Sequence, residues 1–289
     1  MQNQQNTQKI SEAQKKITEL RNIYSERTQN KKAKIFLYGE WGTYKSTLAS
    51  TMPRPILYHS FDPGGEKIKH IQDGVSDGSI IVDNRWQSRN LANSADVFSN
   101  WNTEYNKLKV SGIFNEIGTF VVDSLTTFQR LVVDAAVSSN NKNSVISAKM
   151  PIKIPQMRDY GVQDSAMEFA VSDILDLPCH VLIIGHSEVH EETDSKGNLL
   201  KMEHRPLITG KKLRGKLPLM FDEIYISRIR GNKAEVLTHP QGMYHARTRL
   251  GSLFPIEKAY SNNSIGEFNF TRDILVPAGY ATETQIPKI

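Results

Sequence analysis

The most constraining feature of this sequence is the stretch Lys34–Thr51, which is KIFLYGEWGTYKSTLAST. A short apolar run precedes a glycine-containing turn, and a helix-forming segment follows it. Gly39, Lys45 and Ser46 fall in the spacing G-x-x-x-x-G-K-S/T, which is typical of phosphate-binding loops between a strand and a helix. In such a loop the backbone N–H groups surround the β-phosphate, the lysine reaches the β- and γ-phosphates, and the hydroxyl binds Mg²⁺. We therefore predict an ATP-binding segment made of Gly39, Glu40, Trp41, Gly42, Thr43, Tyr44, Lys45, Ser46 and Thr47.

One residue departs from this pattern, because Tyr44 stands where the second glycine belongs. Glycine permits a backbone geometry that a Cβ hinders. Two outcomes stay open from the sequence: Tyr44 weakens nucleotide binding, or its ring is turned outward and binding persists. Trp41 and Tyr44 either stack on the nucleotide or, as is commoner for aromatic residues, pack against the protein.

Composition narrows the class of protein. The 289 residues suffice for one α/β domain with extensions. Because no apolar run of about 18 residues occurs, we expect no membrane span, and the polar N-terminus does not resemble a signal peptide. The lone cysteine, Cys179, excludes an internal disulfide framework. The net charge is +5, and residues 201–250 hold eleven Lys or Arg against four Asp or Glu, which suits either nucleic acid binding or a solvated face.

Apolar runs and helical periodicity predict a mainly parallel, helix-covered α/β sheet. Further strands are expected at Ile56–Phe61, Ser79–Val82, Thr119–Asp123 and His180–Ile184, and helices at Ile10–Tyr24, Ala95–Leu108 and Tyr160–Leu177. The apolar side of the last helix is expected to carry Ala166, Phe169, Ala170, Ile174 and Leu177. Two strands end in carboxylates, Asp62 and Asp123, and the second is suited to hold Mg²⁺ beside Ser46.

The remaining segments predict the domain organisation. Residues 1–33 form a tail and an amphipathic helix that packs on its own core or on a neighbouring subunit, residues 34–250 form the ATPase core, and residues 251–289 form a C-terminal tail. We expect a mobile loop at Ser138–Pro155 and a protruding hairpin or flexible loop at Val189–Ile208. An antiparallel extension at the sheet edge is predicted from Ile224–Ile229, Ala234–Thr238 and Met243–Ala246.

A family resemblance rests on these segments taken together. They are GEWGTYKSTLA, FDPGG, FVVDSLT, DLPCHVLIIGHSE and the basic GKKLRGKLP before FDEIY. Between Lys34 and Arg249 the chain resembles bacteriophage RecA-like ATPases, and within them the core-only Rad51-related proteins of single-strand annealing and recombination. The resemblance implies a RecA-like fold, ATP and Mg²⁺, self-assembly into rings or filaments, and single-stranded DNA as partner. It also implies a location in the cytoplasm, that of the bacterial host if a phage encodes the chain.

The resemblance implies a role for each site residue. Lys45 and Ser46 hold phosphate and Mg²⁺, and Asp123 is the carboxylate over the metal. Asp62 takes the place of the water-activating Glu, and His186 that of a polar γ-phosphate sensor. Trans-acting fingers for a neighbour's nucleotide are expected among Lys211, Lys212, Arg214 and Lys216, and DNA-binding loops at Ser138–Pro155 and Glu188–Thr209.

Simpler interpretations stay open for several of these residues. Asp62 either activates water or only starts a turn, because Asp-Pro-Gly is a strong turn sequence. His186 is either a sensor or a hydrogen-bonded strand-end histidine. The basic cluster at residues 211–216 is either a set of fingers or a solvated loop.

Two functions from different classes fit the sequence. The first is a Mg²⁺-dependent ATPase that oligomerises and binds single-stranded DNA in phage recombination or replication. The second is a nucleotide-binding scaffold protein with slow or lost hydrolysis, because Tyr44 and Asp62 both depart from the pattern. A small-molecule kinase is less favoured, since no arginine-rich lid segment is found.

Overall fold

The computed structural model describes residues 12–24, 32–87, 94–139, 145–147, 150–153, 157–231, 233–250, 257–260 and 268–287. Contacts divide the chain into two compact units, Met1–Lys32 and Ala33–Ile289. The second unit holds every strand described below.

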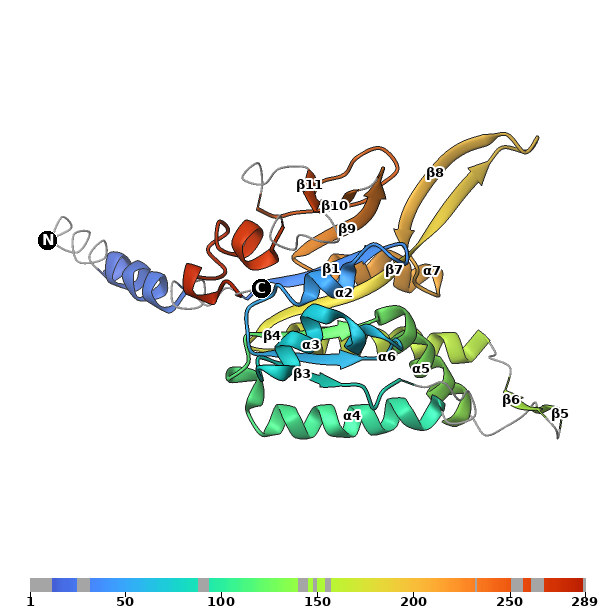
Figure 1. The fold of residues 1–289 in the computed structure, drawn as a ribbon, viewed down its shortest axis with the longest axis horizontal. Helices are drawn as coiled ribbons and strands as arrows, with labels where there is room; N and C mark the ends of the chain where they lie inside the picture. Colours follow the sequence, from blue (N-terminus) through green and yellow to red (C-terminus); the bar gives the residue numbers. More distant parts are fainter. Residues whose placement is uncertain are drawn as a thin grey trace, which may run out of the picture. The chain divides into compact units, whose positions relative to one another are not determined.

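Within the described residues, one sheet runs in the order β11–β10–β9–β1–β7–β4–β2–β3, with β8 paired to β7 (Figure 1). The strands from β9 to β3 in this order are parallel to one another. Their bounds are β1 Lys34–Gly39, β2 Ile56–Ser60, β3 Ile80–Asp83, β4 Thr119–Asp123, β7 His180–Thr193 and β9 Glu223–Arg230. The predicted α/β fold with a mainly parallel sheet is confirmed.

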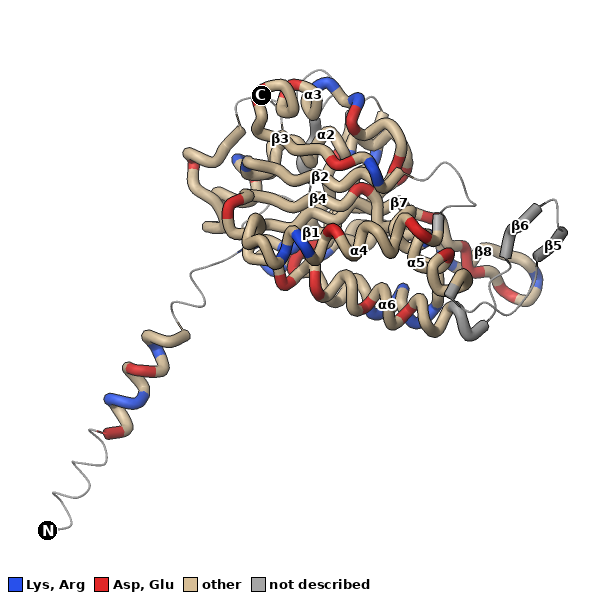
Figure 2. Tube along the Cα trace, turned by 90° about the horizontal axis from the view of Figure 1, so that it is seen from below, with Lys and Arg blue, Asp and Glu red and all other residues tan. Residues whose placement is uncertain are grey.

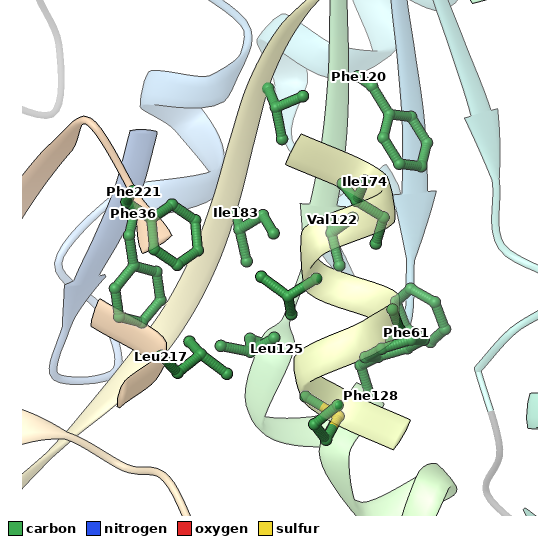
Figure 3. Close-up of a cluster of buried hydrophobic side chains, with 14 of the residues drawn as sticks. Phe36, Phe61, Phe120, Val122, Leu125, Phe128, Ile174, Ile183, Leu217 and Phe221 are labelled. Carbon is green, nitrogen blue, oxygen red and sulfur yellow. The ribbon is translucent and has the colours of Figure 1, made fainter. Parts of the chain in front are cut away.

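Side chains alternate between the two faces of the sheet along each strand, and each face carries a buried cluster. In β1, Phe36 and Tyr38 belong to one core cluster, whereas Ile35 and Leu37 belong to the other. The first cluster contains many aromatic rings, several of them shown in Figure 3. Burial on both faces explains why the strands are nearly continuous apolar runs.

Helices cover the two faces unequally. The first cluster is closed by α4 (Ser94–Val110), α5 (Leu125–Ser139), α6 (Met157–Leu175) and α7 (Lys211–Lys216). The second cluster is closed by α2 (Lys45–Ala49), α3 (Lys69–Ser76) and a segment near the C-terminus. The α2 helix follows the phosphate loop directly, so burial of Leu48 and Ala49 anchors the loop to the core.

The structure corrects the predicted exposure of one residue on α6. Met167, Ala170, Val171 and Ile174 are buried, but Phe169 is 74% exposed. Residues three and four apart share a helix face, so Met167, Ala170, Val171 and Ile174 form one stripe from which Phe169 is displaced.

Two predicted loops contain strands. Strand β7 does not stop at Ile184 but continues to Thr193 and pairs with β8 (Leu199–Pro206), in a hairpin that extends past the sheet (Figure 1). The predicted hairpin is thus present, and its first strand is continuous with the core. Residues 138–155, predicted as a loop without regular structure, contain an antiparallel pair, β5 (Val145–Ser147) and β6 (Met150–Lys153).

The antiparallel edge of the sheet is formed by different segments from those predicted. Strand β9 is parallel to β1 and belongs to the central sheet. The antiparallel pairs are β9 with β10 (Lys233–Leu237) and β10 with β11 (Glu257–Tyr260). The segment 243–246 makes only isolated bridges, because its backbone bonds go to His204 and Gln241 rather than to a ladder.

The described residues of the predicted C-terminal tail, 257–260 and 268–287, belong to the core unit. Phe268, Phe270, Ile274 and Leu275 are buried in the second core cluster, and Phe270 N donates a hydrogen bond to Thr51 Oγ1 at 2.9 Å. A short π-helix, Thr271–Leu275, presents the last two of these side chains. The segment therefore covers the sheet face next to α2.

The first unit contains a helix over residues 12–24, as the apolar periodicity predicted. Its apolar side chains Ile17, Leu20, Ile23 and Tyr24 are all exposed. Figure 2 marks both Lys or Arg and Asp or Glu residues along this helix. None of the helices in the described residues combines the length and apolar character that crossing a bilayer requires.

Candidate nucleotide-binding site

The phosphate loop is held against β9. A Cβ on Gly39 would collide with the carbonyl oxygen of Ser227, so no side chain fits at this position. Ser227 Oγ donates a hydrogen bond to the Thr43 carbonyl at 2.5 Å, and Thr43 Oγ1 donates to the Glu40 carbonyl at 2.8 Å. These bonds fix the turn without any ligand.

Tyr44 adopts a left-handed backbone conformation, which glycine reaches more easily than any other residue. Its φ of 61° and ψ of 24° lie in the left-handed region, which costs a non-glycine residue roughly 1–2 kcal/mol. The ring is half-buried and packs against the second core cluster. The turn before α2 thus forms with a tyrosine at this position, at a cost in backbone strain.

Lys45 lies inside this loop and is only 6% exposed. Its Nζ donates hydrogen bonds to the carbonyls of Gly39 at 3.0 Å and Glu40 at 2.5 Å. Burial lowers the pKa of Lys45 to about 8, although Asp123, Asp62 and Glu40 act in the opposite direction. The ammonium is thus satisfied by loop carbonyls, and phosphate oxygens can replace them.

Asp123 is positioned beside Ser46 by the end of β4. Ser46 Oγ donates to Asp123 Oδ2 at 2.5 Å, and the same oxygen accepts a hydrogen bond from the Tyr58 hydroxyl. Burial raises the pKa of Asp123, while the bonds from Ser46 and Tyr58 and the charge of Lys45 lower it. A hydroxyl and a carboxylate together supply hard oxygen donors.

These donors fit Mg²⁺, which usually keeps several waters and uses only one or two protein carboxylates with substrate phosphates. In the described part of the chain, no group of three or more His, Cys, Asp or Glu could hold a metal alone. A metal here would therefore take its further ligands from nucleotide phosphates and water.

Asp62 lies next to the same centre. The backbone N–H groups of Phe61 and Asp62 both donate to the Asp123 carbonyl, at 2.5 and 3.1 Å, which joins the ends of β2 and β4. The Thr127 hydroxyl donates to Asp62 Oδ1, and His186 Nε2 lies 3.9 Å from Asp62 Oδ2. The carboxylate of Asp62 thus has a fixed orientation beside an imidazole.

These residues surround one open cleft of about 460 Å³. Its lining is Trp41, Gly42, Thr43, Tyr44, Lys45, Ser46, Thr47, Asp62, Pro63, Gly64, Gly65, Ile68, Asp123 and His186. The lining omits Gly39 and Glu40, whose carbonyls accept the hydrogen bonds of Lys45 Nζ. Trp41 is 87% exposed, so it is available to a ligand and buries little area in the core.

Residues 31–250 match the family described as an AAA domain. The chain belongs to the AAA domain family. It therefore carries an ATPase-type P-loop domain. No curated protein matches the sequence.

One solved structure similar to this AAA domain protein is described as "Structural and biochemical analysis of a prototypical ATPase from the type III secretion system of pathogenic bacteria". The similarity covers 67% of this chain and 50% of that one, with a TM-score of 0.40 and 11% sequence identity. This chain therefore spans about half the length of that ATPase.

The four basic residues of α7 do not line the nucleotide cleft of their own AAA domain. Arg214 donates to the Ile208 carbonyl at 3.1 Å and pairs with Glu188 at 3.2 Å, and Lys216 pairs with Glu168 at 3.0 Å. Lys211 and Lys212 are exposed. The structure thus gives two of the four candidate fingers an acidic partner within the chain.

Sequence reasoning missed three residues that position the AAA domain site. Tyr58 holds Asp123, Thr127 holds Asp62, and Ser227 holds the phosphate loop. A weak signal existed for Tyr58, because alternation along β2 places it on the same sheet face as Ile56 and α2. No local signal pointed to Ser227, which is 184 residues from its partner Thr43.

Proposed function

We propose that this protein is a Mg²⁺-dependent ATPase of RecA type that assembles with copies of itself and binds single-stranded DNA. One observation carries the nucleotide part of the proposal: Lys45, Ser46 and Asp123 line one cleft, with the Ser46 hydroxyl bonded to the Asp123 carboxylate. A lysine for phosphate beside a hydroxyl and carboxylate for Mg²⁺ is the chemistry that phosphoryl transfer uses.

The roles of the chain's residues follow from their positions. Lys45 would exchange its loop carbonyls for β- and γ-phosphate oxygens, while Ser46 and Asp123 would hold Mg²⁺. Mg²⁺, when bound, neutralises charge on the phosphates. Asp62, held by Thr127, would orient a water toward the γ-phosphate, and His186 beside it would sense that phosphate.

Self-assembly and DNA binding are the finer part of this proposal. The exposed Lys211 and Lys212 are suited to reach the nucleotide of a neighbouring copy, since they face solvent rather than their own cleft. The exposed apolar stripe of the helix at residues 12–24 is suited to dock on another copy. A role in phage recombination or replication, as in Rad51-related annealing proteins, fits these features.

A second candidate is a nucleotide-binding scaffold with slow hydrolysis. It is favoured by Asp62, because its carboxylate is one methylene shorter than the Glu that activates water in the resembled family. A scaffold of this kind would bind ATP but hydrolyse it slowly or not at all.

ATP hydrolysis measured with Mg²⁺, with and without single-stranded DNA, separates these candidates. The proposed ATPase turns over ATP and responds to DNA, whereas the scaffold binds ATP with negligible turnover. Lys45→Ala should abolish binding or hydrolysis and leave the unfolding midpoint nearly unchanged. Unchanged turnover in this variant would refute the nucleotide assignment.

Mixing variants tests the trans arrangement. Lys45→Ala protein mixed with Lys211→Ala/Lys212→Ala protein should partly recover hydrolysis, because some interfaces pair an intact phosphate loop with intact lysines. Activity of the mixture equal to the sum of the two separate proteins would argue against fingers in trans.

A further inference from the structure

The outward face of α6 carries apolar side chains that the fold leaves exposed. Val162 is 49% exposed and Phe169 is 74% exposed. Spacings of three and four residues place Ser165 and Ser172 on the same side of the helix, one before Phe169 and one after it. Because both serines are small, another helix can approach α6 closely on either side of the Phe169 ring.

A groove of about 510 Å³ lies toward the C-terminal end of this face. Its lining is Phe169, Ser172, Asp173, Leu175 and Asp176. None of these residues lines the nucleotide cleft, so the groove is a separate surface. It combines an exposed aromatic ring with two carboxylates.

The charge on α6 has one sign. Residues 160–177 hold four Asp or Glu and no Lys or Arg, although the whole chain has a net charge of +5. Asp173 pairs with Lys109 of α4, whereas Asp176 is exposed and has no ion pair within the described part of the chain. A polyanion such as DNA is therefore repelled from this groove, and a partner with apolar side chains beside cations is favoured.

The helix at residues 12–24 has the complementary pattern. Its exposed Ile17, Leu20 and Tyr24 are three and four residues apart, so they form one apolar stripe. Lys16 lies four residues before Leu20, and Arg21 lies four residues after Ile17. The stripe is therefore flanked by a cation on each side.

The two surfaces also match in length. The helix at residues 12–24 is about 20 Å long, and the face of α6 from Val162 to Asp176 is about 21 Å long. An isolated helix of this length is only marginally stable in water. Packing on α6 would bury the apolar stripe that is exposed in the single chain.

We propose that the outward face of α6 is the docking surface for the helix at residues 12–24 of a second copy. Phe169 packs against the apolar stripe of that helix, and Asp176 faces Lys16 or Arg21. The choice of a second copy rests on the self-assembly in the proposed function, whereas the complementarity of the two surfaces does not.

Light scattering of the full-length protein over a range of concentrations tests this surface. Phe169→Ser and Leu20→Ser should each raise the concentration at which half of the protein is assembled roughly tenfold or more, because each removes a large apolar contact. Both side chains are exposed in the single chain, so neither variant should lower the unfolding temperature of the monomer.

Leu200→Ser is the matched control, since Leu200 is 64% exposed and lies on β8 rather than on α6. It should change the half-assembly concentration by less than about twofold, as expected for an exposed residue outside the contact. Unchanged assembly in Phe169→Ser, or an equal loss in Leu200→Ser, would overturn the docking surface but leave self-assembly standing. An unmodified protein that is monomeric at every concentration would overturn both.

Reversed charges show whether the helix docks between copies. Asp176→Lys protein and Lys16→Glu/Arg21→Glu protein should each assemble poorly, because like charges then face each other across the contact. A mixture of the two should assemble, since each helix can meet a groove of opposite charge on the other protein. A mixture that assembles no better than the separate proteins would overturn docking between copies, as a helix that docks on its own chain would do.

These measurements are independent of the nucleotide cleft. ATP binding is tested separately through Lys45→Ala, so a failure of the α6 surface leaves the nucleotide assignment standing.

Discussion

At the scale of single residues, Lys45 determines how the site responds to pH. Burial places its pKa at about 8 in the nucleotide-free protein, and bound phosphate would raise it. The free protein therefore loses its ammonium as pH rises through about 8, while the complex keeps it. ATP affinity should be steady below this pH and fall by up to about tenfold per pH unit above it, as expected for one linked proton.

Binding of a fluorescent ATP analogue across this pH range checks the prediction. Lys45→Arg is the control, because a guanidinium keeps its charge throughout the range. Its affinity should vary little with pH. A flat profile for the unmodified protein would show that Lys45 does not need its proton to bind phosphate.

Tyr58 is a second single residue that affects the site, because its hydroxyl contacts the Asp123 carboxylate. Its buried hydroxyl donates to the carboxylate oxygen that also accepts from Ser46. Tyr58→Phe removes one hydrogen bond that orients the carboxylate, worth about 0.5–1.5 kcal/mol net, so the Mg²⁺ concentration for half-maximal hydrolysis should rise roughly 2–10-fold. The rate at saturating Mg²⁺ should change much less.

Tyr225→Phe is a matched control for this measurement. Tyr225 is equally buried and donates to a carboxylate, Glu223, at 2.8 Å, but it lies on β9 and Glu223, unlike Asp123, does not line the cleft. Its Mg²⁺ dependence should match that of the unmodified protein. An identical shift in both variants would mean that Tyr58 contributes only to stability.

At the scale of elements, two substitutions on α6 test which side of this helix faces the sheet. Ile174 is buried in the first core cluster, so Ile174→Ala should lower the free energy of unfolding by about 2–5 kcal/mol. Phe169 is exposed, and Phe169→Ser should change that free energy by no more than about 0.5 kcal/mol. Urea unfolding of the two variants measures both values, and a large loss from Phe169→Ser would mean that this face of α6 is covered in solution.

At the scale of the whole molecule, the two ends of the chain should respond differently to truncation. Deleting Met1–Lys32 leaves the second compact unit intact, so its unfolding temperature should hardly change. Ending the chain at Leu250 removes β11 and the buried Phe268 and Phe270, so that protein should unfold at a much lower temperature or fail to fold. Scanning calorimetry of both truncated proteins distinguishes these outcomes.

The N-terminal deletion has a second, separate readout. If the helix at residues 12–24 docks on another copy, the deletion should also lower the assembled mass in light scattering and the ATPase rate. A deleted protein with unchanged mass and activity would leave that helix without a role in assembly.

The sequence alone determined the features that depend on neighbouring residues. The strand, turn and helix around Lys45 were predictable from local spacing. The carboxylates Asp62 and Asp123 were predictable because each stands where an apolar strand ends. Parallel strands have their carboxyl ends at one edge of the sheet, so the meeting of these residues in one cleft was predictable.

Only the tertiary structure decided which distant segments complete the site and the core. Strand β7 lies between β1 and β4, and β9 holds the phosphate loop through Ser227. The segment near the C-terminus covers one face of the sheet, although the sequence predicted it as a tail outside the core. The pairing of Arg214 with Glu188 likewise joins residues from separate elements. The physical reason is that strand partners and ion pairs depend on complementary surfaces brought together by folding, and no local pattern encodes which surfaces will meet.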